Sequence, residues 1–245
     1  MIEYFSKIRE ILDVVEKEES DNIKKAVELL TETIFNKGSI YIFGASHAGI
    51  LCEEMYYRAG GLMLMNPIFA KELMLDASPV TKTSKMEQLN GYGSVIASKV
   101  GFKRGDVLIV HSVSGRNPVG IEMAIWAQGV GVKVIALTNL SYSKSVTSRH
   151  EAGKNLYEYS DIIIDNHGDI GDACVKLPGL EQQVGATSTV VGATVLNSII
   201  VETTRTLLER GMKKPPIFYS ANLDGGDELN QKLFAEYKDS IHYKL

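Results

Sequence analysis

Apolar residues recur every three or four positions at the start of the chain, which predicts amphipathic helices. The apolar face of the first helix consists of Tyr4, Phe5, Ile8, Ile11, Leu12 and Val15. A second helix follows Ser20 and Asp21, either of which suits an N-cap, and Gly38 ends it. Residues 1–37 are therefore expected to form an N-terminal helical segment.

From residue 40 onward the helical period gives way to short continuous apolar runs, which predict buried strands. Five runs have this character: 40–43, 62–69, 107–110, 132–137 and 162–164. Helical patterns lie between the later runs, including 119–128, and a long one covers 184–209. Buried strands that alternate with helices predict an α/β fold, with a parallel sheet covered on both faces.

Two stretches lack this regularity. Residues 71–90 are mixed and polar, and we expect them to form a loop or lid. Residues 213–245 carry turn residues, including D-G-G-D at 224–227, and suggest an arm over the domain or over a partner subunit. Nothing marks a second domain. We therefore expect a single domain over 1–245, with its core at 38–211 and the arm at 212–245.

Composition narrows the function classes. A net charge of −4 with no long basic run argues against a nucleic acid or an anionic membrane as partner. No apolar stretch is long enough to span a membrane, and the acidic N-terminus does not resemble a signal peptide. The two cysteines, Cys52 and Cys174, suggest no disulfide framework. These features favour a reducing, cytoplasmic location.

Two strand–helix junctions carry small polar residues that suit an anion. The run 40–43 leads into G-A-S-H-A-G at 44–49, and 107–110 leads into H-S-V-S-G-R-N at 111–117, with Pro118 opening the next helix. Ligands of open α/β sheets bind at these carboxyl ends, where free N–H groups and helix dipoles attract phosphate. Ordinary strand–helix turns share this composition and are the alternative. Neither loop matches a dinucleotide or P-loop motif.

These residues resemble the sugar isomerase (SIS) domain family. G-D-V-L-I-V at 105–110 with S-V-S-G-R-N-P at 112–118 is similar to the family's central signature, and 44–46 to its first phosphate loop. Residues 133–139 resemble the next strand. Residues 179–187 look like a third element, in which a glycine-x-glutamate sequence opens the long helix. The resemblance covers roughly 36–210, and the whole chain is similar to stand-alone SIS proteins.

The resemblance implies a three-layer αβα sandwich, with a five-stranded parallel sheet in the flavodoxin-like order 2-1-3-4-5. It also implies homodimers or homotetramers. The ligand would be a sugar phosphate, with no cofactor. Carried over by position, the phosphosugar-binding residues would be Gly44, Ala45, Ser46, Ser112, Ser114, Gly115, Asn117 and Thr187.

Three functions stay open at this point. Most relatives move a proton on a sugar phosphate, which favours an isomerase for a phosphorylated sugar or amino sugar. A lyase or etherase of an amino-sugar phosphate is the first alternative, because the sequence S-G-R-N-P at 114–118 is most similar to that of the etherases. A phosphosugar sensor without catalysis is the second.

Four residues are considered for acid–base catalysis, and the three adopted as candidates are Glu181, His47 and Glu54. Glu181 is the first choice for the base, although it could instead be a capping carboxylate at a helix start. His47 directly follows Ser46 and could reach the ligand, and His111 has similar standing. Glu54 is the third candidate. Phosphoheptose isomerases and the etherases carry a glutamate on its helix, but Tyr56 takes that position here.

An acidic loop with a histidine is the only candidate for a metal site. It contains Asp165, His167, Asp169 and Asp172. Its spacing matches no metal motif, and acidic loops are usually only solvated. We expect no metal.

Overall fold

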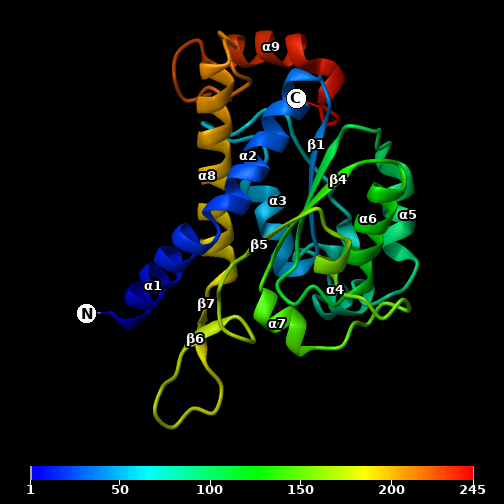
Figure 1. Cartoon of the computed structure of the whole chain (residues 1–245), viewed down its shortest axis with the longest axis vertical. Helices are drawn as coiled ribbons and strands as arrows, with labels where there is room; N and C mark the ends of the chain where they lie inside the picture. The colour runs from blue at the N-terminus through cyan, green and yellow to red at the C-terminus, as the bar shows by residue number, and fades with distance from the viewer. Residues whose placement is uncertain (1, 245) are drawn as a thin grey trace.

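A computed structural model describes residues 2–244, and a five-stranded parallel sheet forms their centre (Figure 1). The strands are β1 (Ile40–Gly44), β2 (Met65–Pro67), β3 (Val107–His111), β4 (Lys133–Thr138) and β5 (Ile162–Asp165). They lie in the order β2-β1-β3-β4-β5, which confirms the predicted fold class and topology. Met1 and Leu245, the ends of the predicted single domain, lie outside the described residues.

Both faces of the sheet are buried, which explains why its strands read as continuous apolar runs. Side chains alternate between the two faces of a strand. Val107 and Ile109 of β3 belong to one hydrophobic core, and Leu108 and Val110 belong to the other. The sheet therefore contributes to two separate cores.

Helices cover each face of the sheet (Figure 1). The first core packs under α2 (Ser20–Phe35), α3 (Ile50–Glu54) and α8 (Ser188–Glu209), and the second under α5 (Tyr92–Val100) and α6 (Pro118–Gly129). None of the helices within residues 2–244 combines the length and the apolar character needed to cross a bilayer.

Two elements project beyond the sheet in Figure 1. One is α1 (Glu3–Glu18). The other is an antiparallel hairpin of β6 (Ala173–Val175) and β7 (Val184–Ala186). The remaining elements are α4 (Thr81–Met86), α7 (Leu140–Ser145), α9 (Gly226–Tyr237) and the short 3-10 turns η1 (Ser46–Gly49), η2 (Lys71–Leu73), η3 (Leu156–Tyr159) and η4 (Lys238–Ser240).

Several predicted boundaries were wrong. The helix expected over 184–209 begins at Ser188, because residues 184–186 pair with β6 as a strand. The second strand covers only three residues of the run 62–69. Residues 71–90, expected as a loop, contain η2 and α4. Glu19, rather than Ser20 or Asp21, precedes α2.

The C-terminal arm packs on its own domain, which was one of its two expected positions. Ile217 forms a β-bridge with Leu62 near the edge of the sheet. Farther along, the His242 N–H donates to Asn66 Oδ1 at 2.7 Å, and the Tyr243 hydroxyl donates to the Met63 carbonyl at 2.6 Å. The arm thus covers the β2 side of the sheet.

Candidate functional site

Strand pairing brings the two predicted phosphate loops together. β1 and β3 are neighbours, and Gly44 at the end of β1 pairs with His111 at the end of β3. β2 flanks β1 on one side and β4 flanks β3 on the other, so the chain leaves the two strands in opposite directions. In open α/β sheets a ligand crevice forms at this point.

The first loop folds tightly against itself. A Cβ at Gly44 would lie 2.4 Å from the Ala48 carbonyl oxygen, so only glycine fits there. Ser46 follows with φ of 54°, in the left-handed region that non-glycine residues rarely adopt. Backbone strain of this kind is concentrated at functional sites.

The second loop turns its carbonyl groups toward β4. The Thr138 hydroxyl donates to the Ser112 carbonyl at 2.6 Å, and the Asn139 N–H donates to the Val113 carbonyl at 3.0 Å. In a planar peptide the C=O and the following N–H point in opposite directions. The N–H groups of Val113 and Ser114 therefore point away from β4.

Gly115 is required where this loop bends. Its φ is 61°, and a Cβ there would lie 2.8 Å from Ser143 Oγ and 3.3 Å from Thr138 Oγ1. After it, Asn117 precedes α6 in extended conformation and Pro118 is the first helical residue, as predicted.

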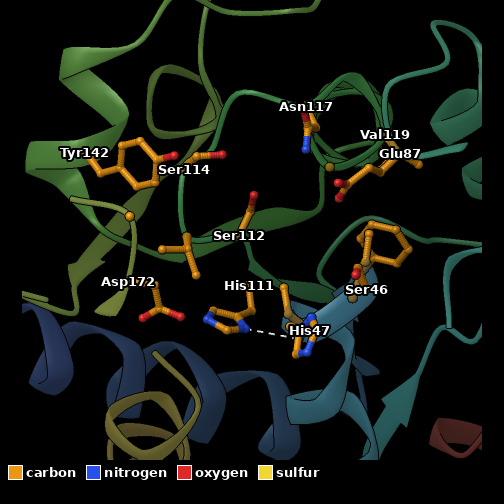
Figure 2. A pocket seen from close by; sticks show the side chains of 16 residues that line it. Ser46, His47, Glu87, His111, Ser112, Ser114, Asn117, Val119, Tyr142 and Asp172 are labelled. Atoms are coloured by element: carbon orange, nitrogen blue, oxygen red, sulfur yellow. Dashed lines mark hydrogen bonds between the residues drawn. The ribbon is translucent and has the colours of Figure 1, made fainter. Parts of the chain in front are cut away.

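The two loops enclose a cavity of about 240 Å³ (Figure 2). It is lined by Phe43, Ala45, Ser46, His47, Ala48, Glu87, His111, Ser112, Val113, Ser114, Asn117, Val119, Gly120, Tyr142, Gly171 and Asp172. None of these lining residues is a lysine or an arginine. An anion here would be held by hydroxyl groups, backbone N–H groups and helix dipoles.

Most of the predicted binding residues meet in this cavity. Lining residues among the predictions are Ala45, Ser46, His47, Ser112, Ser114 and Asn117. Gly44 and Gly115 shape the loops without lining the cavity. Thr187 lies behind the wall, buried, and its N–H donates to the Asp172 carboxylate at 3.1 Å.

The two predicted catalytic glutamates do not line the cavity. Glu54 lies on α3, pairs with Arg58 and is within 3.5 Å of the Asn197 amide nitrogen. Glu181 was expected to open the long helix, and that placement is wrong. It lies exposed between β6 and β7, seven residues before α8 begins at Ser188. The role of Glu181 as a base stays a prediction, and Glu181 does not line the cavity of its own chain.

His111 forms part of the cavity wall and is almost fully buried. Its Nδ1 lies 3.0 Å from the Ala48 carbonyl oxygen. A carbonyl can only accept, so Nδ1 carries the proton. Burial lowers the pKa of the imidazole, which favours the neutral ring. Nε2 has no hydrogen-bond partner among the described residues.

Two aspartates of the acidic loop considered for a metal accept hydrogen bonds from nearby N–H and hydroxyl groups. Asp165 accepts from the Leu140 and His167 N–H groups, each at 3.0 Å. Asp172 caps α8 by accepting from the N–H of Ser188 at 2.7 Å and from its hydroxyl at 2.6 Å. Among residues 2–244, no group of three or more metal-ligating side chains is close enough to hold an ion.

Sequence reasoning missed two lining residues with polar, titratable side chains, Glu87 and Tyr142. Glu87 directly follows α4, inside the segment predicted to be a loop or lid. Burial raises the pKa of its carboxyl, while Asn117 and Arg149 lower it. Tyr142 lies on α7, where Asn139 Oδ1 accepts from its N–H at 2.7 Å. No local pattern marks either residue, because only the fold brings them to the cavity.

The family model described as the SIS domain matches residues 3–139, more than half of the chain. The chain belongs to the SIS domain family. UPF0309 protein OB3413 of Oceanobacillus iheyensis is 50% identical over 243 residues, which are 99% of this chain and 98% of that protein. UPF0309 protein ABC0887 of Shouchella clausii is 49% identical over 241 residues, 98% of each chain.

Solved structures show the same SIS fold. Phosphoheptose isomerase GmhA from Neisseria gonorrhoeae matches with a TM-score of 0.54 and 18% identity, over 82% of this chain and 95% of that one. A phosphoheptose isomerase from Francisella tularensis matches with a TM-score of 0.53 and 14% identity, over 83% and 95%. At these identities the likeness concerns the fold alone.

Proposed function

We propose that this protein binds a sugar phosphate in the cavity between β1 and β3 and isomerises it by proton transfer. One observation carries the proposal: Ser46, Ser112 and Ser114 line a cavity that Glu87 also lines. Hydroxyls beside loop N–H groups suit a phosphate, and a carboxylate suits proton transfer. Two proteins with this fold carry the name phosphoheptose isomerase, which is a reaction of this class.

The size and charge of the cavity favour a monosaccharide phosphate over a nucleotide. Its volume of about 240 Å³ lies below the roughly 300–1,000 Å³ typical of sites for drug-sized ligands. Its lining contains no lysine or arginine. Nucleotide phosphates in transfer enzymes are met by lysine, arginine or magnesium. Neutral donors are better matched to a single phosphate group.

A thermal-shift screen tests ligand class first. Fructose 6-phosphate, sedoheptulose 7-phosphate, glucosamine 6-phosphate and muramic acid 6-phosphate are compared with their free sugars and with ATP. A ligand at 100 times its Kd stabilises the folded state by about 2.7 kcal/mol. We expect a sugar phosphate to raise the Tm and its free sugar to leave it unchanged. A shift with ATP alone would contradict the proposal.

Serine variants then test the phosphate contacts. Ser112→Ala and Ser114→Ala should each weaken binding of the sugar phosphate about tenfold or more, since a hydrogen bond to a charged group contributes about 1.5–3 kcal/mol. Binding of the free sugar should not change. Ser98→Ala on α5 is the matched control, because Ser98 is exposed and its hydroxyl bonds only to the Val95 carbonyl at 2.7 Å. Equal losses for both ligands would refute the assignment.

A turnover assay separates isomerase from the two other functions. Interconversion of an aldose and a ketose phosphate is the expected result. Cleavage of the ether in muramic acid 6-phosphate would instead identify a lyase. Binding of a sugar phosphate without chemical change would identify a sensor.

A further inference from the structure

Glu87 is held at the cavity wall by main-chain and side-chain contacts. Its carbonyl accepts a hydrogen bond from the Val119 N–H, in the first turn of α6, at 3.3 Å. Its carboxylate and the Asn117 side chain point toward one another (Figure 2), and Asn117 lowers the pKa of this carboxyl. Asn117 Oδ1 in turn accepts from Arg149 Nη1 at 2.8 Å. The side chains of Arg149, Asn117 and Glu87 thus lie in succession and lead to the cavity.

This environment shifts the pKa of the Glu87 carboxyl in two opposite directions. Burial raises the pKa of the carboxyl, because the charged form loses hydration. The Asn117 amide and the Arg149 cation lower the pKa, because both stabilise the carboxylate. A carboxyl whose pKa is raised toward neutrality can accept a proton and later return it, which general acid–base catalysis requires.

The other titratable lining residues are less suited to this task. Asp172 accepts hydrogen bonds from the first turn of α8, so its oxygens are already occupied. His111 donates from Nδ1 to Ala48, and its Nε2 is shielded from solvent. His47 is exposed at the start of η1. Among the carboxylate and histidine side chains of the lining, Glu87 is the one that combines a position in the cavity wall with contacts to Val119 and Asn117.

We infer that Glu87 is the catalytic acid–base residue of this cavity and that Asn117 and Arg149 are its positioning residues. The inference rests on the proposed isomerase function. The Glu87 carboxylate removes the proton from C2 of an aldose phosphate, and the electrons of that C–H bond form the C1=C2 bond of an enediolate. The hydroxyl proton on O2 passes to O1, and Glu87 returns its proton to C1. The ketose phosphate results, with no external oxidant or reductant.

The first experiment measures proton exchange in D2O with fructose 6-phosphate, sedoheptulose 7-phosphate and glucosamine 6-phosphate as probes. The wild-type chain should incorporate deuterium next to the carbonyl carbon of its substrate. Glu87→Gln should slow both exchange and turnover roughly 10³-fold, within the range of general acid–base effects. The same probe should still raise the Tm of this variant, because the amide keeps the shape of the side chain.

Glu72→Gln is the matched control, since Glu72 lies in the same segment but outside the cavity, where the Tyr92 hydroxyl donates to it at 3.1 Å. It should exchange and turn over at the wild-type rate. Exchange by Glu87→Gln at the wild-type rate would overturn the assignment of Glu87 and leave the isomerase function standing. Binding by the wild type with no exchange of any probe would overturn both.

The second experiment tests the positioning role through a pH profile. The acid limb of kcat/KM reports the pKa of the base in the free protein. Arg149→Gln removes the cation, so the pKa of Glu87 should rise and the acid limb should move to higher pH. Arg149→Lys should restore most of the shift by keeping the charge. The other titratable lining residues are unchanged in both variants: His47, His111, Tyr142 and Asp172. An equal loss of rate at every pH would contradict the positioning role.

Discussion

Two glutamates of this chain occupy opposite kinds of structure. Glu87 lies in the inner wall of the cavity, where Val119 binds its carbonyl and Asn117 faces its carboxylate. Glu181 lies exposed at the tip of the β6–β7 hairpin, which projects beyond the sheet in Figure 1. The two carboxylates therefore differ in where they lie relative to the sheet, although each belongs to a connecting segment between elements. Proximity to the carboxyl ends of β1 and β3 decides which one can reach a ligand bound there.

The two regions also differ in how firmly they are held. The second cavity loop is tied to the end of β4, where Thr138 and Asn139 donate hydrogen bonds to two successive carbonyl groups of the loop. The hairpin is anchored at its base, where the Tyr4 hydroxyl donates to the Ala186 carbonyl at 2.6 Å. Its tip, residues 176–183, is exposed. A substitution should therefore cost more stability in the cavity loops than in the hairpin.

A pair of glycine variants tests this difference in stability. Gly115→Ala should destabilise the protein by roughly 3 kcal/mol, because it combines the left-handed backbone penalty with overlap against Ser143 and Thr138. Gly179→Ala in the hairpin should cost only about 1 kcal/mol. Gly179 has φ of 81°, but an added Cβ would meet nothing within 4 Å. Urea unfolding of both variants measures the difference, and equal losses would contradict it.

The pH dependence of stability gives a second test, centred on Glu87. A carboxyl whose folded pKa is raised contributes stability below its unfolded pKa and loses that contribution as the pH rises through the folded pKa. Burial raises the pKa of Glu87, and Glu87→Gln removes the titration. The Tm of Glu87→Gln relative to wild type should therefore increase between pH 4 and pH 7.

Glu72→Gln supplies a control of opposite sign for this measurement. The pKa of Glu72 is lowered by its own backbone N–H and by the Tyr92 hydroxyl. Its contribution to stability is present above the unfolded pKa and lost on acidification. The Tm of Glu72→Gln relative to wild type should fall slightly over the same pH range. A parallel trend in the two variants would contradict the burial of Glu87.

The fold could be predicted from the sequence because its signals are local. Continuous apolar runs identified the buried strands, and the small polar residues at 44–49 and 111–117 identified the loops that meet in the cavity. Strand order came from the family resemblance and agrees with the structure. These features depend on residues that are close in sequence, or on a topology shared by the whole family.

The carboxylates of the site could not be placed in the same way. Residues 184–186 fit a helical period, but pairing with β6 makes them a strand and separates Glu181 from α8. Glu87 reaches the cavity because its carbonyl binds the Val119 N–H, 32 positions along the chain. Its polar neighbours at 81–90 carry no periodic signal for this contact. The positions of Glu181 and Glu87 therefore depend on contacts between elements that are not encoded in the local sequence.

The smallest expected effect is that of Glu181→Gln on turnover. Glu181 does not line the cavity of its own chain, so the variant should retain turnover within about threefold, less than the 10²–10⁴-fold typical of a lost acid or base. A steady-state assay beside Glu87→Gln measures this. A loss of 10² or more would mean that a second copy brings the hairpin to the cavity. In that case, mixing the Glu181→Gln and Glu87→Gln chains would restore activity, because hybrid assemblies regain one complete site.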